Sequence, residues 1–172
     1  MYLKLYDYLG GAHSHLVAHA PQEWLNSNLK QKKIIFNVEW DSFPTLYYFT
    51  GDKFRYVTGL EPRFLYDLDA RMYWTWNNIG QGLYCEATDC SDMKKKREDV
   101  LRNEESKKYW YESQGDLIAN SILKDFKTDI IVSSLRRKDL LDVMDNSSRF
   151  KKEFFDDKNS AYVIYRIIDK TP

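Results

Sequence analysis

Positions 39–41 bring together side chains that could do chemistry. Glu39, Trp40 and Asp41 follow the apolar run "KKIIFNV". Two carboxylates beside an indole ring suit a sugar, because the ring stacks on the sugar face and the acids accept hydrogen bonds from hydroxyl groups. The same carboxylates could hold a divalent cation or act as an acid and base pair. The structural alternative makes Asp41 a helix cap and Trp40 a core residue.

Further candidates lie downstream, in "GLEP" and "MYWTW". Glu61 follows a second apolar run and is equally compatible with a turn before Pro62. The aromatic side chains at positions 73, 74 and 76 are candidate stacking platforms for a ligand. We therefore predict a ligand-binding set without an assigned catalytic residue: Glu39, Trp40, Asp41, Glu61, Tyr73, Trp74 and Trp76.

Two patterns could in principle bind a metal ion. Asp67 and Asp69 form a D-x-D pair, which in nucleotide-sugar transferases ligates the metal on the diphosphate, but 26 acidic residues make such a pair expected by chance. His13, His15 and His19 cluster near the start of the chain without an acid that completes an H-E-x-x-H site. The sequence predicts neither a metal site nor a cofactor.

Length and charge limit the classes of function. A chain of 172 residues fits one domain, residues 1–172, and can bury a sizeable core without a metal. The 26 basic and 26 acidic residues cancel, which removes the electrostatic argument for nucleic acid. No apolar run reaches the roughly 18–20 residues that span a bilayer. Cys85 and Cys90 are close enough for a small-loop disulfide, and two free thiols are equally compatible with the sequence.

Alternating strand and helix patterns must position these residues. Strands are expected over 32–40, 53–59, 128–134 and on both sides of a polar turn at 157–160, with helices over 21–33, 41–49, 63–79, 116–126 and 135–146. The charged stretch at about 91–114 is expected to be a helical or mobile insertion. This order predicts an α/β fold: a three-layer sandwich with a mostly parallel sheet and a C-terminal antiparallel hairpin.

The fold rule for such sheets makes a prediction about the site. In open α/β sheets, ligands bind beyond the carboxyl ends of the strands. Glu39, Trp40 and Asp41 follow the first expected strand, Glu61 follows the second and Ser133 ends the third. We therefore expect these residues near one edge of the sheet.

Three segments carry a resemblance: "EWLNSN", "KIIFNVEWDSFPTLYYF" and "YVTGLEPRFLY". They resemble the extracytoplasmic C-terminal region of uncharacterised bacterial polytopic membrane proteins, although Glu61 stands where that region has Asp. The tail from "DFKTDIIVSS" to "AYVIYRI" is similar to the closing α/β segment of lipid-linked-sugar glycosyltransferases. The resemblance covers about two-thirds of the chain, and the charged middle has no counterpart in it.

The resemblance implies a non-catalytic domain of a membrane-associated, glycosyltransferase-like protein. Such a domain would bind a glycan or a protein partner on the extracytoplasmic face, and would meet the membrane only through a segment outside this chain. Without the resemblance, a cytoplasmic location is expected. Two alternatives remain open: a free-standing metal-assisted transferase or hydrolase that uses Glu39, Asp41 and Glu61 or the D-x-D pair, and a pure protein-interaction module.

Overall fold

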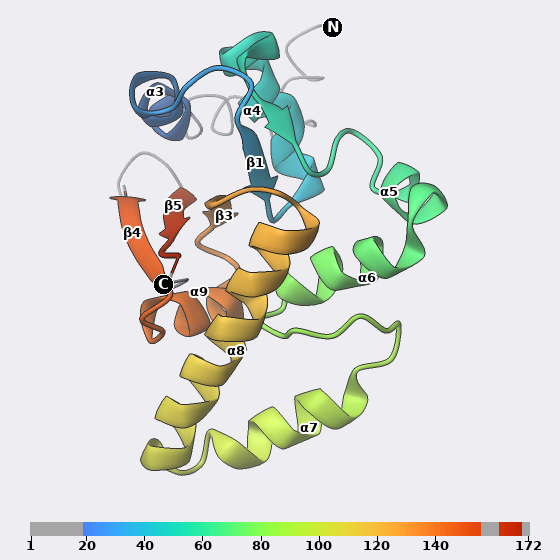
Figure 1. The fold of residues 1–172 in the computed structure, drawn as a ribbon, viewed down its shortest axis with the longest axis vertical. Coiled ribbons are helices and arrows are strands. Elements are labelled where there is room, and N and C mark those ends of the chain that lie inside the picture. Colours follow the sequence, from blue (N-terminus) through green and yellow to red (C-terminus); the bar gives the residue numbers. More distant parts are fainter. Residues whose placement is uncertain (1–18, 156–161, 170–172) are drawn as a thin grey trace, which may run out of the picture.

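Five strands form one mixed sheet in the order β2-β1-β3-β5-β4 (Figure 1). The computed structural model describes residues 19–155 and 162–169. The strands are β1 (Ile34–Asn37), β2 (Arg55–Tyr56), β3 (Ile130–Ser134), β4 (Phe150–Phe155) and β5 (Tyr162–Ile167). The α-helices are α3 (His19–Asn28), α4 (Phe43–Thr50), α5 (Arg63–Leu68), α6 (Ala70–Ile79), α7 (Ser91–Val100), α8 (Glu104–Asp125) and α9 (Lys138–Asp145). Two 3-10 turns, η1 (Trp40–Ser42) and η2 (Gly51–Lys53), flank α4.

The expected α/β class is confirmed, with a parallel part and an antiparallel part in the sheet. β1 is parallel to both β2 and β3, with Phe36 opposite Ile131. β4 and β5 form the antiparallel C-terminal pair, and β5 is the strand that lies next to β3. The polar turn expected at 157–160 lies outside the described residues. The three-layer arrangement stays a prediction.

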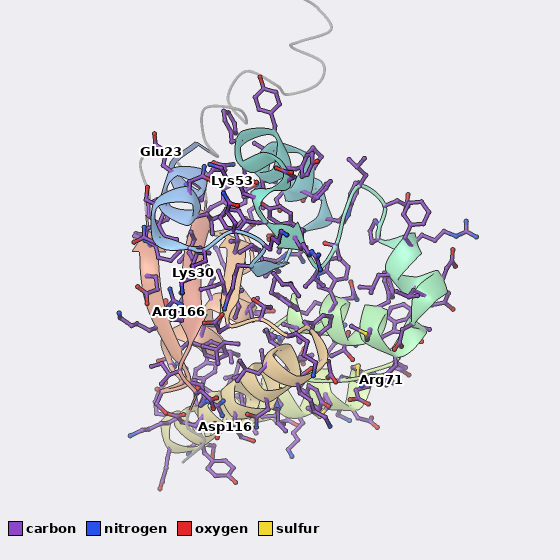
Figure 2. All side chains as sticks on the ribbon, turned by 45° about the horizontal axis from the view of Figure 1, so that its top comes forward. Glu23, Lys30, Lys53, Arg71, Asp116 and Arg166 are labelled. Atoms are coloured by element: carbon purple, nitrogen blue, oxygen red, sulfur yellow. A yellow bond between two sulfur atoms is a disulfide. The ribbon has the colours of Figure 1, made fainter. Side chains whose placement is uncertain are left out.

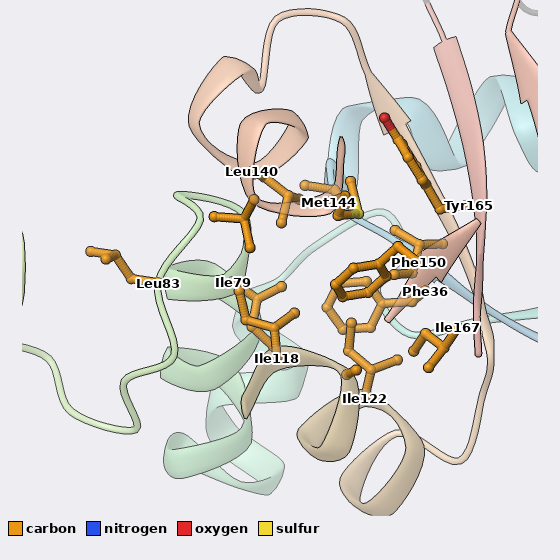
Figure 3. Packing of buried hydrophobic residues seen from close by; sticks show 14 of the residues in the cluster. Phe36, Ile79, Leu83, Ile118, Ile122, Leu140, Met144, Phe150, Tyr165 and Ile167 are labelled. Carbon is orange, nitrogen blue, oxygen red and sulfur yellow. The ribbon is translucent and has the colours of Figure 1, made fainter. Parts of the chain in front are cut away.

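Two apolar clusters show how the strands alternate their side chains. Phe36 and Ile131 belong to a cluster with residues of α6, α8 and α9, whereas Ile35 and Ile130 belong to a second cluster with α3 and α4. Successive side chains of a strand point to opposite faces, so this division follows directly from the short apolar runs. Figure 3 shows the larger cluster, with labelled side chains from strands and helices meeting in one core.

The sequence of the long helix α8 fixes where the helix starts and which side of it is buried. Asn103 caps its start, because the side-chain Oδ1 accepts from the Ser106 N–H at 3.0 Å. Ile118 and Ile122 are fully buried at the expected spacing of four. At Gly115 the helix approaches the turn before β4 so closely that an added Cβ would meet Ser147 Oγ at 2.1 Å.

The charged stretch at 91–114 lies in α7 and the first half of α8. In Figure 1, α7 runs outward below the sheet and is joined to α8 at residues 101–103. The charged residues Lys30, Lys53 and Arg71, which are labelled in Figure 2, are exposed. Among residues 19–155 and 162–169, no helix is both long and apolar enough to cross a membrane.

Candidate functional site

The carboxyl ends of β1 and β3 meet at one edge of the sheet, as the parallel pairing requires. Val38, just past β1, donates its N–H to Val132 O at 3.0 Å, which carries the pairing beyond the strand. Glu39 is the second residue after the end of β1, and Ser134 is the last residue of β3. The predicted acid therefore lies at the expected edge, beside the start of the β3–α9 connection.

Internal hydrogen bonds occupy the carboxylate of Glu39. Its Oε1 accepts from the Ser134 hydroxyl at 2.8 Å and from Arg137 Nε at 3.0 Å, while Oε2 accepts from the Ser134 N–H at 3.2 Å. The Glu39 side chain is only 10% exposed. Burial of a charge requires partners of this kind, so Glu39 ties β1 to the β3–α9 turn.

A second set of buried bonds lies two residues earlier, at Asn37, the last residue of β1. The Asn37 amide nitrogen donates to Thr58 O at 2.9 Å and Thr58 Oγ1 at 2.8 Å, and Thr58 N–H donates back to Asn37 Oδ1 at 3.1 Å. These bonds hold the chain that leaves β2 against β1. Sequence reasoning did not single out Asn37, although a polar residue at the end of an apolar run was a usable signal.

Trp76 does not form the stacking platform that we predicted. It is 4% exposed, and its Nε1–H donates to Asn37 O at 3.0 Å. The indole belongs to the core because α6 turns this face toward the sheet. Tyr73 and Trp74, by contrast, are half-buried and make edge-on ring contacts with each other and with Tyr66 at centroid distances of 5.0–6.4 Å.

Trp40 and Asp41 remain available at the edge. The Trp40 side chain is 47% exposed and Asp41 is exposed. Tyr162, at the start of β5, lies near both acids: burial raises its pKa to about 12, and the charges of Glu39 and Asp41 add to the rise. The structure thus brings Glu39, Trp40 and Asp41 to one place but leaves only the last two in contact with solvent.

Glu61 lies at a different position, after β2. Its Oε1 accepts from the Arg63 N–H at 3.1 Å, which shapes the turn into α5. Glu61 also lines a pocket of about 210 Å³, whose apolar walls include Val57, Leu65 and Leu68. Thr58, which also lines this pocket, accepts from the Asn37 amide nitrogen, and the same nitrogen donates to Glu39 O at 3.3 Å. Apart from the buried Trp76, the grouping of the predicted residues into one site stays a prediction.

The remaining candidates for metal ligands have structural roles. Asp69 caps α6 by accepting from the Met72 N–H at 3.0 Å, and Asp67 pairs with Arg63 at 3.7 Å across one helical turn. His13 and His15 lie outside the described residues. Within residues 19–155 and 162–169, no group of three or more His, Cys, Asp or Glu side chains is arranged to hold a metal ion.

Cys85 and Cys90 form a disulfide, which decides between the two alternatives that the sequence left open. The loop that they close is organised by Asn78 of α6, which is 3% exposed. Its amide nitrogen donates to Cys85 O and Ala87 O, both at 2.9 Å. The disulfide loop leads directly into α7 and fixes where that helix begins.

A large cleft lies where the sequence analysis assigned no function. It has a volume of about 670 Å³ and is formed by α7 and α8. Met93, Lys96 and Val100 line it from α7. These residues are spaced three and four apart, which is the spacing of one face of a helix. The charged residues of "KKKRED" around them made this face hard to recognise in the sequence. We call this feature the α7–α8 cleft.

Comparison with known proteins identifies no relative. The chain matches no protein-family model, no curated protein and no solved structure. Functional conclusions therefore depend on the geometry described above.

Proposed function

We propose that this chain is a binding domain without catalysis of its own, and that it recognises another protein through an apolar surface around α5. This α5 surface comprises Leu60, Phe64 and Leu68, which are 65%, 73% and 83% exposed. Three large apolar side chains exposed within nine residues are unusual for a surface that faces only water, and this observation carries the proposal.

The pocket behind these side chains supports a protein as the partner. About 210 Å³ in volume, it accommodates one side chain of a partner, and Phe64 and Leu68 stand at its wall. Leu and Phe offer no hydrogen bonds to sugar hydroxyl groups, whereas an apolar side chain fills such a pocket well. Protein recognition fits the α5 surface better than carbohydrate recognition does.

Site-specific cross-linking in the cells that make the protein would test this proposal. A photoreactive amino acid at position 64 should give a discrete adduct with another protein or with a second copy of this chain. The same group at Lys95, which is exposed on α7, serves as the matched control. Leu68→Asp should abolish the adduct, because it places a charge in the apolar contact. Equal labelling at positions 64 and 95 would contradict the proposal.

A second candidate is a glycan site at Trp40 and Asp41. The exposed indole beside an exposed carboxylate offers one stacking face and one hydrogen-bond acceptor. A glycan array probed with the domain and with Asp41→Ala tests it. Binding that disappears in the variant supports the glycan site, and an array without signal removes this candidate.

We also propose an extracytoplasmic location, as the resemblance to membrane-associated glycosyltransferase-like proteins implies. The Cys85–Cys90 disulfide supports it, because such bonds persist mainly in oxidising compartments. Labelling of the native protein with a thiol reagent before and after reduction tests this point. Modification of both cysteines without reduction would argue for a cytosolic location.

A further inference from the structure

A small cavity lies at the carboxyl edge of the sheet, between the β3–α9 connection and the end of α6. The residues that line it are Gly80, Gln81, Arg136, Arg137, Lys138 and Asp139. Its volume is about 200 Å³, below the range of about 300–1,000 Å³ that is typical of sites for drug-sized molecules. The cavity therefore suits a small ligand or the head group of a larger one. We call it the β3–α9 cavity.

The path of the chain makes this edge the place where an α/β sheet binds ligands. β2 and β3 pair with β1 on its two sides. The chain that leaves β1 continues into α4, which packs in one apolar cluster through Leu46, whereas the chain that leaves β3 continues into α9, which packs in the other through Leu140. The two clusters lie on opposite faces of the sheet, so the two connections turn away from each other. Ligands of open α/β sheets bind at such a point.

The end of α6 lies close to the same point. An added Cβ at Gly80 would lie 3.3 Å from Cγ1 of Val38, the first residue after β1. Val38 in turn donates its N–H to Val132 O of β3 at 3.0 Å. The β3–α9 cavity therefore lies beside the ends of both parallel strands.

The side chains of the cavity carry a net positive charge. Three of the lining residues are basic, and one, Asp139, is acidic. The Asp139 carboxylate is already paired with Arg97 of α7 at 3.1 Å. Asp41 lies at the same edge of the sheet but is not among the residues that line the cavity. The lining therefore favours an anion.

The basic side chains still have free hydrogen-bond donors. Arg136 and Lys138 are exposed and form no ion pair within residues 19–155 and 162–169. Arg137 uses only its Nε–H for Glu39 Oε1, at 3.0 Å, so the terminal nitrogens of its guanidinium group have no acceptor in the described part of the chain. Because Ser134 also holds the Glu39 carboxylate, this bond fixes where the Arg137 guanidinium lies.

We propose that the β3–α9 cavity binds a phosphate group, either as the free ion or as part of a small phosphate monoester. A phosphate group carries a charge of about −1.5 to −2 at pH 7, which matches a lining with two unpaired basic residues, Arg136 and Lys138. Guanidinium groups form paired hydrogen bonds with phosphate oxygens, and a lysine adds a compact charge. This site is separate from the α5 surface and does not depend on the function proposed for it.

An NMR titration of the ¹⁵N-labelled protein at constant ionic strength tests the proposal, with inorganic phosphate, glycerol 3-phosphate, acetate and glycerol as probes. Both phosphates should give saturable shifts of the backbone amides of residues 80–81 and 136–139. Acetate, with a single charge, should bind at least about fivefold more weakly, and glycerol should not bind. Tighter binding of one phosphate than of the other distinguishes the free ion from the ester as the ligand.

Charge variants test where the phosphate lies. Arg136→Gln and Lys138→Gln should each weaken inorganic phosphate about three- to fivefold, because each removes one exposed cation from the cavity. Asp139→Asn should strengthen it, because this variant removes the acid of the lining. Lys30→Gln is the matched control: it removes an exposed cation that precedes β1, at the opposite end of that strand, and should leave the affinity unchanged.

Shifts that do not saturate, or that spread over basic residues of the whole surface, would overturn the proposal. Acetate that binds as tightly as phosphate would do the same, as would an effect of Lys30→Gln as large as that of Arg136→Gln. The substituted residues are exposed, so the variants should keep the fold, which the spectra of the free proteins report. If one variant does not fold, the comparison of phosphate with acetate on the wild-type protein still decides the question.

Discussion

The carboxyl edge of the sheet and the α7–α8 cleft differ in whether their buried polar groups have hydrogen-bond partners. At the edge, three donors satisfy the Glu39 carboxylate, and Asn37 is bonded to Thr58 in both directions. In the cleft, Trp110 Nε1–H has no acceptor within the described residues. The fold rule indicates the edge as the place for a ligand, whereas the unpartnered donor lies inside the wall of the cleft, out of contact with solvent.

This difference separates two roles that look alike in a sequence. An acid after a strand can serve a ligand or serve the fold, and only its partners distinguish the two. Glu39 serves the fold, because each of its oxygens already accepts from the β3–α9 turn. A group that serves a ligand is partnered incompletely until the ligand binds.

The largest effect is expected from Glu39→Ala. The substitution leaves Arg137 and the Ser134 N–H without their acceptor, which should lower the free energy of unfolding by about 2–3 kcal/mol. Urea denaturation measures the loss. Asp41→Ala is the matched control, because that acid is exposed and its carboxylate makes no hydrogen bond or ion pair within the described residues, and it should stay within about 0.5 kcal/mol. Equal losses in both variants would show that Glu39 is not the structural acid of the pair.

Removal of the disulfide should have the next largest effect. The double substitution of Cys85 and Cys90 by serine opens a short loop. Loop-closure entropy predicts that the free energy of unfolding falls by about 2 kcal/mol. The loss should reach the cleft as well, because the disulfide loop fixes the start of α7. The indole N–H resonance of Trp110, which lines the cleft, should therefore shift in the double variant. The edge should keep its geometry, which the unchanged resonance of Trp76 Nε1–H would report.

Asn78→Ala separates the disulfide from the loop that it closes. This variant keeps the cysteines but removes the donor to Cys85 O and Ala87 O. If the loop position controls the cleft, Asn78→Ala should shift the Trp110 indole resonance as the double serine variant does. An unmoved Trp110 resonance in Asn78→Ala would show that the disulfide positions α7 without help from Asn78.

Alkaline titration tests the electrostatics of the edge, with a smaller effect. The pKa of Tyr162 is raised to about 12 by burial and by the negative charges of Glu39 and Asp41. A tyrosine near its ordinary pKa of about 10 in the unfolded chain loses its proton first, so stability is fully present below pH 10 and falls up to pH 12. Tyr162→Phe should remove about 1–2 kcal/mol of this fall, after discounting for partial exposure.

Other tyrosines also respond to alkali, so the difference between the two proteins is the quantity that matters. The pKa of Tyr56 is also raised to about 12, mainly by burial. Stability of wild type and Tyr162→Phe should therefore decline together, with the steeper decline in wild type. If the free energy of unfolding falls in parallel for the two proteins from pH 9 to pH 12, the titration of Tyr162 does not contribute to the fall.

The sequence predicted the strands and several helices well, because their signals are local. The runs that contain Ile35 and Ile131 are short and β-branched, and Ile118 and Ile122 repeat with helical spacing. The place of β5 between β3 and β4 was not predicted, since strand order depends on contacts between distant segments. These are the parts of a fold that one-dimensional patterns do not encode.

The site was predicted in part, for a reason that the tryptophans make plain. Trp40 follows a predicted strand and Trp76 lies in a predicted helix, and both have aromatic residues nearby in the sequence. Trp40 is nevertheless 47% exposed, whereas Trp76 is only 4% exposed. Which side of a helix faces the core is decided by packing against the sheet, and Trp76 faces inward to reach Asn37 O. The cleft was missed because Met93 and Val100 are two apolar residues in a ten-residue helix of otherwise polar or charged side chains.

Trp40→Ala should have the smallest effect on stability. The indole is 47% exposed and contributes little to either apolar cluster, so the free energy of unfolding should change by less than about 1 kcal/mol. Urea denaturation beside Glu39→Ala measures the contrast between adjacent residues. A stable Trp40→Ala protein can then be applied to the glycan array, where loss of signal reports recognition alone. A large loss of stability would instead make Trp40 part of the same structural unit as Glu39, and the glycan site would contain no free recognition residue except Asp41.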